Sequence, residues 1–186
     1  MLLEDVYNNG WLEVYKEETI KTNHYWRADL NVKRAEAFIN YFGSLKNLKI
    51  LEIGPGGGTL AKILLSGMGE SVTNYTLVDH PRMLENTSNT LGVNNKVSYV
   101  KAHQIASLEN QQFDIIISTG CLSETAENYM EYLYTKIFPN CSMVFIVDGG
   151  NEFLPKLKKR LAEIYPNIEI IPWTEPCPAD LILVKK

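Results

Sequence analysis

The stretch that organises this chain is Lys49–Leu64, which reads KILEIGPGGGTLAKIL. It begins with an apolar run at Ile50–Ile53, which is typical of a buried central strand. Four glycines follow within five residues, from Gly54 to Gly58, and apolar residues then recur at helical spacing from Leu60 to Leu64. The stretch therefore predicts a strand, a glycine turn and a helix. In such a turn the backbone approaches a ligand closely and the helix N-terminus points at it.

The same rhythm of strands and helices continues along the chain. Further strands are predicted at Tyr75–Asp79, Val97–Val100, Phe113–Ser118, Met143–Asp148, Ile168–Ile171 and Leu181–Val184. Helices are predicted at 31–42 with Asn31 as cap, from Pro81 to Gly92, at Thr125–Phe138 and at Phe153–Tyr165. Two short helices and a less regular piece at Thr22–Asp29 are predicted within the aromatic-rich residues 1–30.

This alternation predicts an α/β fold in which helices cover both faces of a mostly parallel, seven-stranded sheet. The Pro-rich stretch Pro172–Pro178 leaves no room for a helix, so the last two strands are expected to form an antiparallel hairpin. Residues 1–45 are expected to form a helical cap segment, and residues 46–186 the ligand-binding domain.

Composition excludes several classes of function. The formal net charge of the 186 residues is −4, which disfavours binding to a nucleic acid backbone. No run approaches the ~20 apolar residues that a membrane span needs. The N-terminus is acidic and lacks the apolar core of a signal peptide. Cys121, Cys141 and Cys177 are odd in number and show no pairing framework or zinc spacing, which favours a cytoplasmic protein.

The acidic residue Asp79 lies 25 residues after Gly54, at the end of the second predicted strand. A carboxylate at that place can accept hydrogen bonds from the two hydroxyls of a ribose. It can also cap the helix that begins at Pro81. Because Asp79 occurs together with the glycine turn, ribose binding is the favoured interpretation.

Two residues bear on which nucleotide the turn binds. A dinucleotide fingerprint needs a glycine or alanine where this chain has Thr59, and no Gly-Lys-Ser/Thr sequence completes a P-loop. Glu52, two residues before the first glycine, would repel a pyrophosphate. It would suit a ligand that carries an amino group or another cation. An NAD-linked oxidoreductase is therefore disfavoured.

The segment from Glu52 to Gly58 resembles the E-x-G-x-G-x-G motif of S-adenosylmethionine-dependent methyltransferases with the Rossmann-like fold, and Asp79 stands at their ribose-binding position. This resemblance covers about residues 45–186 and implies a three-layer sandwich with an antiparallel last strand. Two pieces, Val78–Leu84 and Ile117–Glu124, resemble segments of bacterial sugar O-methyltransferases, with departures at His80, Arg82, Ser118 and Cys121.

The resemblance implies S-adenosylmethionine as cofactor and a small, sugar-like hydroxyl compound as methyl acceptor. It implies cofactor contacts for Glu52, Gly54, Pro55, Gly56, Gly58, Asp79, His80, His103, Gln104 and Ser118. His103 and Gln104 would serve where the superfamily often has an acidic residue. No metal is expected, although some related sugar methyltransferases use one, and a homodimer is consistent with the sequence.

Transfer of a methyl group to a hydroxyl is assisted by a base. Glu124 is the first candidate, against the alternative that it stabilises the first turn of a helix. His24 is the second, in a segment that could close over the pocket or pack onto the sheet. Two functions remain open at this point: a methyltransferase, and a module that binds the nucleoside but has lost acceptor chemistry.

Overall fold

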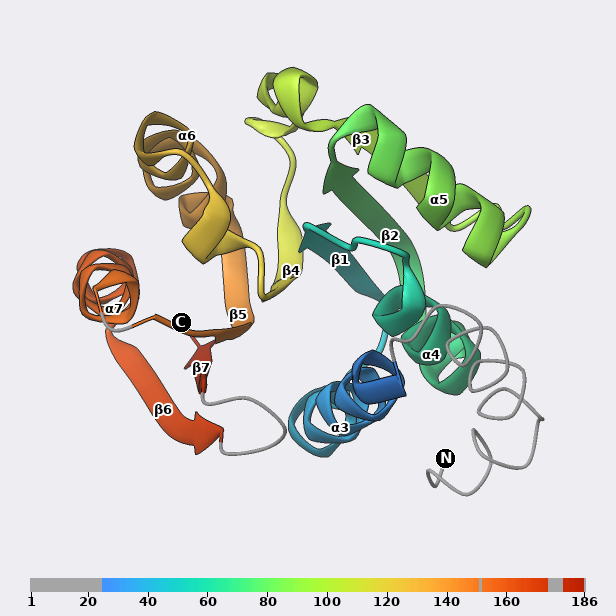
Figure 1. The fold of residues 1–186 in the computed structure, drawn as a ribbon, viewed down its shortest axis with the longest axis horizontal. Coiled ribbons are helices and arrows are strands. Elements are labelled where there is room, and N and C mark those ends of the chain that lie inside the picture. The colour runs from blue at the N-terminus through green and yellow to red at the C-terminus, as the bar shows by residue number, and fades with distance from the viewer. Residues whose placement is uncertain (1–24, 151, 174–178, 186) are drawn as a thin grey trace.

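The computed structural model describes residues 25–150, 152–173 and 179–185. Seven strands form one sheet in the order β3-β2-β1-β4-β5-β7-β6 (Figure 1). Their bounds are Leu48–Ile53 for β1, Val72–Asp79 for β2, Val97–Lys101 for β3, Phe113–Thr119 for β4, Cys141–Asp148 for β5, Asn167–Trp173 for β6 and Ala179–Lys185 for β7.

The first five strands are parallel, and β7 runs antiparallel to both of its neighbours, β5 and β6. The predicted sheet and its terminal antiparallel pair are therefore confirmed. Within this pair, β7 lies between β5 and β6, so that β6 forms the edge of the sheet. At the other side of the sheet, β1 lies between β2 and β4, where Ile53 pairs with Val78 and with Ser118. This register brings the ends of three strands together at the glycine turn.

Helices cover the sheet on both faces, as Figure 1 shows. Their bounds are Tyr25–Phe42 for α3, Thr59–Met68 for α4, Pro81–Leu91 for α5, Glu127–Tyr132 for α6 and Phe153–Ile164 for α7. One apolar cluster joins α3, α4 and α5 to one face, with Phe38, Leu64 and Leu84 among its members. A second cluster joins α6 and α7 to the other face through Met130 and Leu161. The result is the predicted three-layer sandwich.

Two helix predictions need correction. The helix predicted at 31–42 begins six residues earlier, at Tyr25, and Asn31 is an internal residue of it rather than its cap. The buried residue Leu30 extends the inner face of α3, so burial continues beyond the polar residue that seemed to start the helix. The predicted helix Thr125–Phe138 is shorter as an α-helix. It changes at 133–137 into a π-helical turn and ends in a 3-10 turn that contains Pro139.

Other boundaries agree with their sequence signals. Helix α5 has Pro81 in its first turn, and α7 spans nearly the predicted residues. The two short helices predicted before residue 25 lie outside the described residues. Within the part of the chain that the structure describes, no helix combines the length and apolar character needed to cross a membrane.

Candidate functional site

A cavity of about 610 Å³ opens at the carboxyl ends of the parallel strands. Its described lining comes from α3, the glycine turn and the ends of β2, β4, β5 and β7. The lining residues are Leu30, Asn31, Arg34, Glu52, Gly54, Pro55, Gly56, Gly57, Leu60, Asp79, Met83, Thr119, Gly120, Cys121, Glu124, Val147, Asp148, Gly149 and Ala179. This is the edge at which open parallel sheets bind ligands.

The glycine turn passes close to the loop after β4. Gly54 has a φ of +74°, and its amide donates to Val78 O at 2.9 Å. A Cβ at this position would lie 2.3 Å from Cys121 Sγ, so only glycine fits. Gly56 and Gly57 are not packed in this way, because a Cβ at either position would have nothing within 4 Å. The turn is therefore packed on one side and open on the cavity side.

Thr87, a fully buried residue of α5, contacts the glycine turn. Its hydroxyl lies 2.7 Å from Gly56 O and 2.8 Å from Met83 O, and can donate to either carbonyl. Its methyl group would be 2.6 Å from a Cβ at Gly58, which has a φ of +77°. No sequence pattern predicts this contact, because the spacing of 31 residues follows no motif.

Asp79 contacts the same turn from β2. One carboxylate oxygen accepts from Gly56 N at 3.1 Å, and the other accepts from His80 N at 2.6 Å. The N-cap of α5 is His80, whose Nδ1 accepts from Arg82 N at 3.4 Å, so Asp79 does not cap this helix. Asp79 is half-buried and lines the cavity, which leaves its carboxylate within reach of a ligand.

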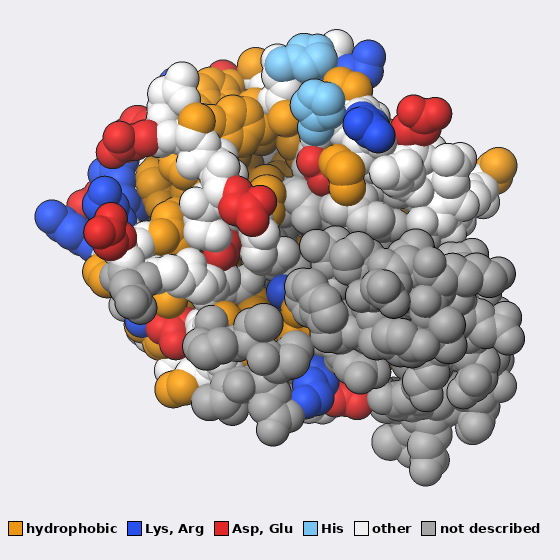
Figure 2. All heavy atoms as spheres, viewed as in Figure 1, with side chains coloured by type: hydrophobic (Ala, Val, Ile, Leu, Met, Phe, Trp, Pro, Cys, Tyr) orange, Lys and Arg blue, Asp and Glu red, His pale blue; other side chains and the backbone are white. Residues whose placement is uncertain are grey.

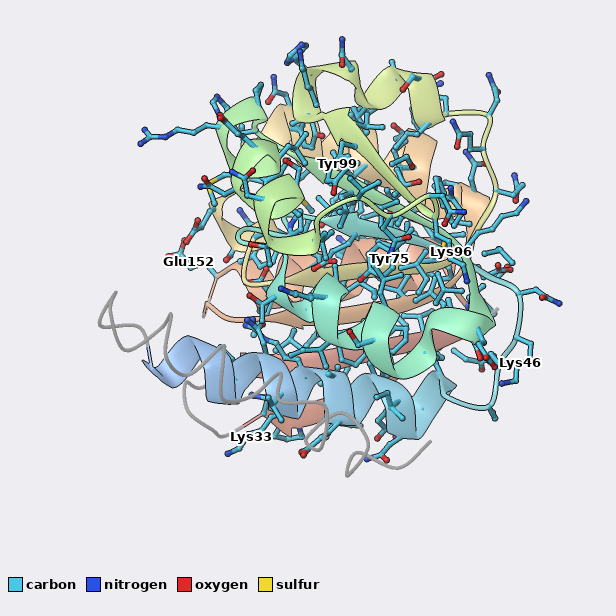
Figure 3. All side chains as sticks on the ribbon, turned by 90° about the vertical axis from the view of Figure 1, so that its right-hand side faces the viewer. Lys33, Lys46, Tyr75, Lys96, Tyr99 and Glu152 are labelled. Atoms are coloured by element: carbon cyan, nitrogen blue, oxygen red, sulfur yellow. The ribbon has the colours of Figure 1, made fainter. Side chains whose placement is uncertain are left out.

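Glu52, at the end of β1, lines the cavity and is 1% exposed. Tyr75 donates its hydroxyl proton to Glu52 Oε2 at 2.8 Å. Figure 3 shows Tyr75 in the interior of the molecule, near α4. Burial raises the pKa of Glu52 to about 7, with a smaller increase from Asp79, while the hydrogen bond from Tyr75 and the charge of Arg34 oppose this increase. Glu52 therefore changes its charge near neutral pH.

The loop after β4 is tied to the end of β5 by a buried carboxylate. Asp148 is 2% exposed, and its oxygens accept from Ser123 Oγ at 2.6 Å, from Ser123 N at 3.2 Å and from Gly149 N at 2.8 Å. Glu124, which follows Ser123 in the chain, is the last residue of a 3-10 turn at Leu122–Glu124. It lines the cavity and is exposed. The loop therefore has a fixed base and a solvent-accessible carboxylate.

The remaining site residues named from the sequence have varied locations. Ser118 is fully buried in β4 and donates to Ile53 O at 2.9 Å. His80, His103 and Gln104 do not appear in the cavity lining, and the last two are exposed in a 3-10 helix at 102–108. Figure 2 shows histidine side chains on the outer surface of this face. His24 lies outside the described residues.

Several lining residues were not identified from the sequence as part of a site, and one of them, Arg34, is a cation. Arg34 reaches the cavity from α3. No motif contains it, and the signal that would have helped is its spacing from Ala35, Phe38 and Phe42, which places it beside the buried face of the helix.

Two further groups near the cavity bear on its chemistry. Burial raises the pKa of the Cys121 thiol to about 11, so this cysteine is a poor nucleophile at neutral pH. Among the described side chains, no three His, Cys, Asp or Glu residues gather in a way that would hold a metal ion. The absence of a metal remains a prediction from the sequence.

No protein-family model and no curated protein matches the chain. Solved structures do match in fold. One is precorrin-6y C5,15-methyltransferase from Geobacter metallireducens, at 15% identity and a TM-score of 0.64, covering 82% of this chain and 87% of that one. Another is ribosomal protein L11 methylase from Lactobacillus delbrueckii, at 17% identity and a TM-score of 0.61, covering 89% and 81%. A third, an O-methyltransferase family protein from Burkholderia thailandensis, has 9% identity and a TM-score of 0.60, covering 92% and 62%.

These likenesses establish that the chain has the Rossmann-like fold found in methyltransferases. At such identities they establish the fold alone. The names of the matched proteins refer to different methyl acceptors, a precorrin in one case and a ribosomal protein in another. The acceptor must therefore be argued from the site of this chain.

Proposed function

We propose that the protein is an S-adenosylmethionine-dependent methyltransferase. The observation that carries this proposal is the position of Glu52, a buried carboxyl group that lines the same cavity as the glycine turn. A pyrophosphate on this turn would lie against that carboxyl group, whereas the ammonium group of an amino acid would be attracted to it. The failure of the dinucleotide fingerprint at Thr59 points the same way.

The residues of the cavity fit this cofactor. The open side of Gly56 and Gly57 leaves space for the methionine portion. Asp79, at the end of β2, would accept hydrogen bonds from the ribose hydroxyls, and Glu52 would bind the ammonium group. We assign His80, His103 and Gln104 to the adenine end, where each would act from the rim of the cavity rather than from its floor.

When bound, S-adenosylmethionine supplies a methyl carbon that is activated by its bond to a positively charged sulfur. The chain's own contribution is alignment of the two reactants and removal of the hydroxyl proton. Glu124 would accept that proton, because it is the exposed carboxylate on the cavity wall at the loop after β4.

The acceptor in this proposal is a small hydroxyl compound, and sugar-like compounds are the first to test. The cavity supports a small acceptor, since about 610 Å³ must hold both the cofactor and the acceptor and lies in the range of pockets for small molecules. Its wall beyond the glycine turn carries Thr119, Glu124 and Asp148, which are polar groups suited to hydroxyls.

Thermal unfolding of the full chain with S-adenosylmethionine, S-adenosylhomocysteine and NAD tests the cofactor. A ligand at a hundred times its dissociation constant stabilises the folded state by about 2.7 kcal/mol. We expect stabilisation by the two sulfur compounds and none by NAD. Stabilisation by NAD alone would contradict the proposal. A protein that binds both sulfur compounds but methylates no member of a broad hydroxyl panel would instead be a binding module.

Glu124→Gln tests the base. Once a methylated acceptor is found, the loss of a general base should lower kcat about 10²- to 10⁴-fold. Because Glu124 is exposed, the same change should leave the midpoint of thermal unfolding and the affinity for S-adenosylhomocysteine unchanged. Glu127→Gln, three residues on and outside the cavity lining, is the matched control. Unchanged kcat in Glu124→Gln would remove this residue from the mechanism.

A further inference from the structure

The charges on the cavity wall are unevenly distributed. Among the described lining residues there are four carboxyl groups and one cation, Arg34. Two of the carboxylates already accept several hydrogen bonds, Asp79 from the amides of Gly56 and His80, and Asp148 from Ser123 and Gly149. The single cation therefore marks the one place on this wall where a negatively charged group of a ligand is attracted.

Arg34 extends from α3 towards the loop after β4. Its Nη1 donates to Asn31 Oδ1 at 3.2 Å, one turn back on the helix. Its Nη2 would lie 3.7 Å from a Cβ at Gly120, a residue with a φ of +69°. The guanidinium group therefore lies beside this loop and lines the cavity.

Arg34 also lies near Glu52. Its positive charge is one of the influences that lower the pKa of the Glu52 carboxyl group. Arg34 and Glu52 thus both line the cavity and influence each other electrostatically, while the hydroxyl of Tyr75 holds the Glu52 carboxyl group. Such a pair matches the two charges of a free amino-acid group, which carries an ammonium and a carboxylate on neighbouring atoms.

We propose that Arg34 binds the carboxylate of the amino-acid group of S-adenosylmethionine, while Glu52 binds its ammonium group. This inference rests on the proposed function. Arginine suits the role because its planar guanidinium group can donate two parallel hydrogen bonds to a carboxylate. It makes α3 part of the cofactor site, so the segment before the glycine turn does more than cover the sheet.

Four ligands separate the two charges of the amino-acid group. S-adenosylmethionine and S-adenosylhomocysteine carry both charges, decarboxylated S-adenosylmethionine keeps only the ammonium group, and 5′-methylthioadenosine has neither. Calorimetric titration of the wild-type chain should give at least tenfold weaker binding of the decarboxylated compound than of S-adenosylmethionine. Hydrogen bonds to charged groups justify this expectation, since tenfold corresponds to about 1.4 kcal/mol.

Variants then assign each charge to a residue. Arg34→Gln should weaken binding of S-adenosylmethionine and S-adenosylhomocysteine at least tenfold and change binding of the other two ligands less than twofold. Glu52→Gln should weaken every ligand that carries the ammonium group and leave 5′-methylthioadenosine unaffected. Arg34→Lys keeps the charge and should lose less affinity than Arg34→Gln. Lys33→Gln is the matched control, because Lys33 lies on the outer side of α3 (Figure 3).

The results that would overturn the proposal are distinct. Equal loss for all four ligands in Arg34→Gln would mean a structural role for Arg34, and equal wild-type affinity for S-adenosylmethionine and its decarboxylated form would exclude a carboxylate contact without any variant. Unchanged binding in Arg34→Gln would leave the residue for the acceptor instead. If the wild-type chain binds none of the four ligands, the proposed function itself fails.

Discussion

The two ends of the cavity differ in how their polar groups are held. At the glycine-turn end, Asp79 and Thr87 hydrogen-bond to the peptide groups of the turn, and Tyr75 holds Glu52. At the end formed by the loop after β4, the buried carboxylate of Asp148 fixes the loop, whereas Glu124 on the same loop is exposed to solvent.

This difference separates a part of the site that would serve the cofactor from a part that would serve the methyl acceptor. In the proposed function, groups that peptide contacts already hold in place suit a cofactor that every turnover would use. A solvent-accessible carboxylate on a surface loop can serve different acceptors as the loop changes.

The largest loss of stability is expected from Gly54→Ala, in the glycine turn. The added Cβ would lie 2.3 Å from Cys121 Sγ, in a backbone conformation with a φ of +74°. Strain and overpacking together should lower the free energy of unfolding by about 3 kcal/mol. Urea denaturation measures this loss, and Gly57→Ala, whose Cβ meets nothing within 4 Å, is the control. Equal stability of the two variants would show that the turn is less tightly packed than described.

The pH dependence of the free energy of unfolding in Glu52→Gln tests the same end of the cavity. The pKa of Glu52 in the folded protein, about 7, is above its ordinary value of 4.5, so the folded state holds this proton more tightly than the unfolded chain. The stability that this provides is fully present below pH 4.5 and is lost as the pH rises through 7. A neutral amide avoids the loss, so the variant should exceed the wild type by on the order of 3 kcal/mol at pH 8.

Urea denaturation at pH 5 and pH 8, without ligand, measures this difference. At pH 5 the variant and the wild type should differ little. Glu70→Gln, at an exposed residue, is the control and should show no such pH dependence. A constant difference between Glu52→Gln and the wild type across this range would mean that Glu52 stays charged in the folded protein.

The smallest effect is expected at the other end. Ser123→Ala removes the hydroxyl that donates to Asp148 at 2.6 Å but leaves the amides of Ser123 and Gly149 in place. The free energy of unfolding should fall by about 1 kcal/mol. Affinity for S-adenosylhomocysteine should change less than twofold, which calorimetry measures, with Ser142→Ala on β5 as control. A large loss of affinity would show that the two ends are not independent.

The predictable parts of the molecule are those encoded by neighbouring residues. Strand β1, the glycine turn and Asp79 follow from local patterns, because apolar periodicity and positive φ are properties of short segments. The residues that were missed act over distance. Thr87 contacts a carbonyl 31 residues away, and Arg34 reaches the cavity because of how α3 packs on α4.

The start of α3 also decides where Arg34 lies. Asn31 has the residue type of a helix cap, yet it lies inside α3, and its side chain accepts a hydrogen bond from Arg34 instead. A helix that begins at Asn31 would have Arg34 in its first turn. With the helix beginning at Tyr25, Arg34 lies in its middle, where packing fixes the direction of a side chain.

The position of β7 between β5 and β6 has a consequence for the synthesis of the protein. Strand β6 pairs with β7, and the sheet order gives it no other neighbour. It therefore cannot join the sheet until the ribosome has made Ala179–Lys185. A product that stops before Ala179 loses two strands rather than one and exposes the edge of β5, whose Val144 and Ile146 normally pair with β7. Such an edge invites pairing with other chains, so premature termination here should produce aggregates rather than a shortened, folded protein.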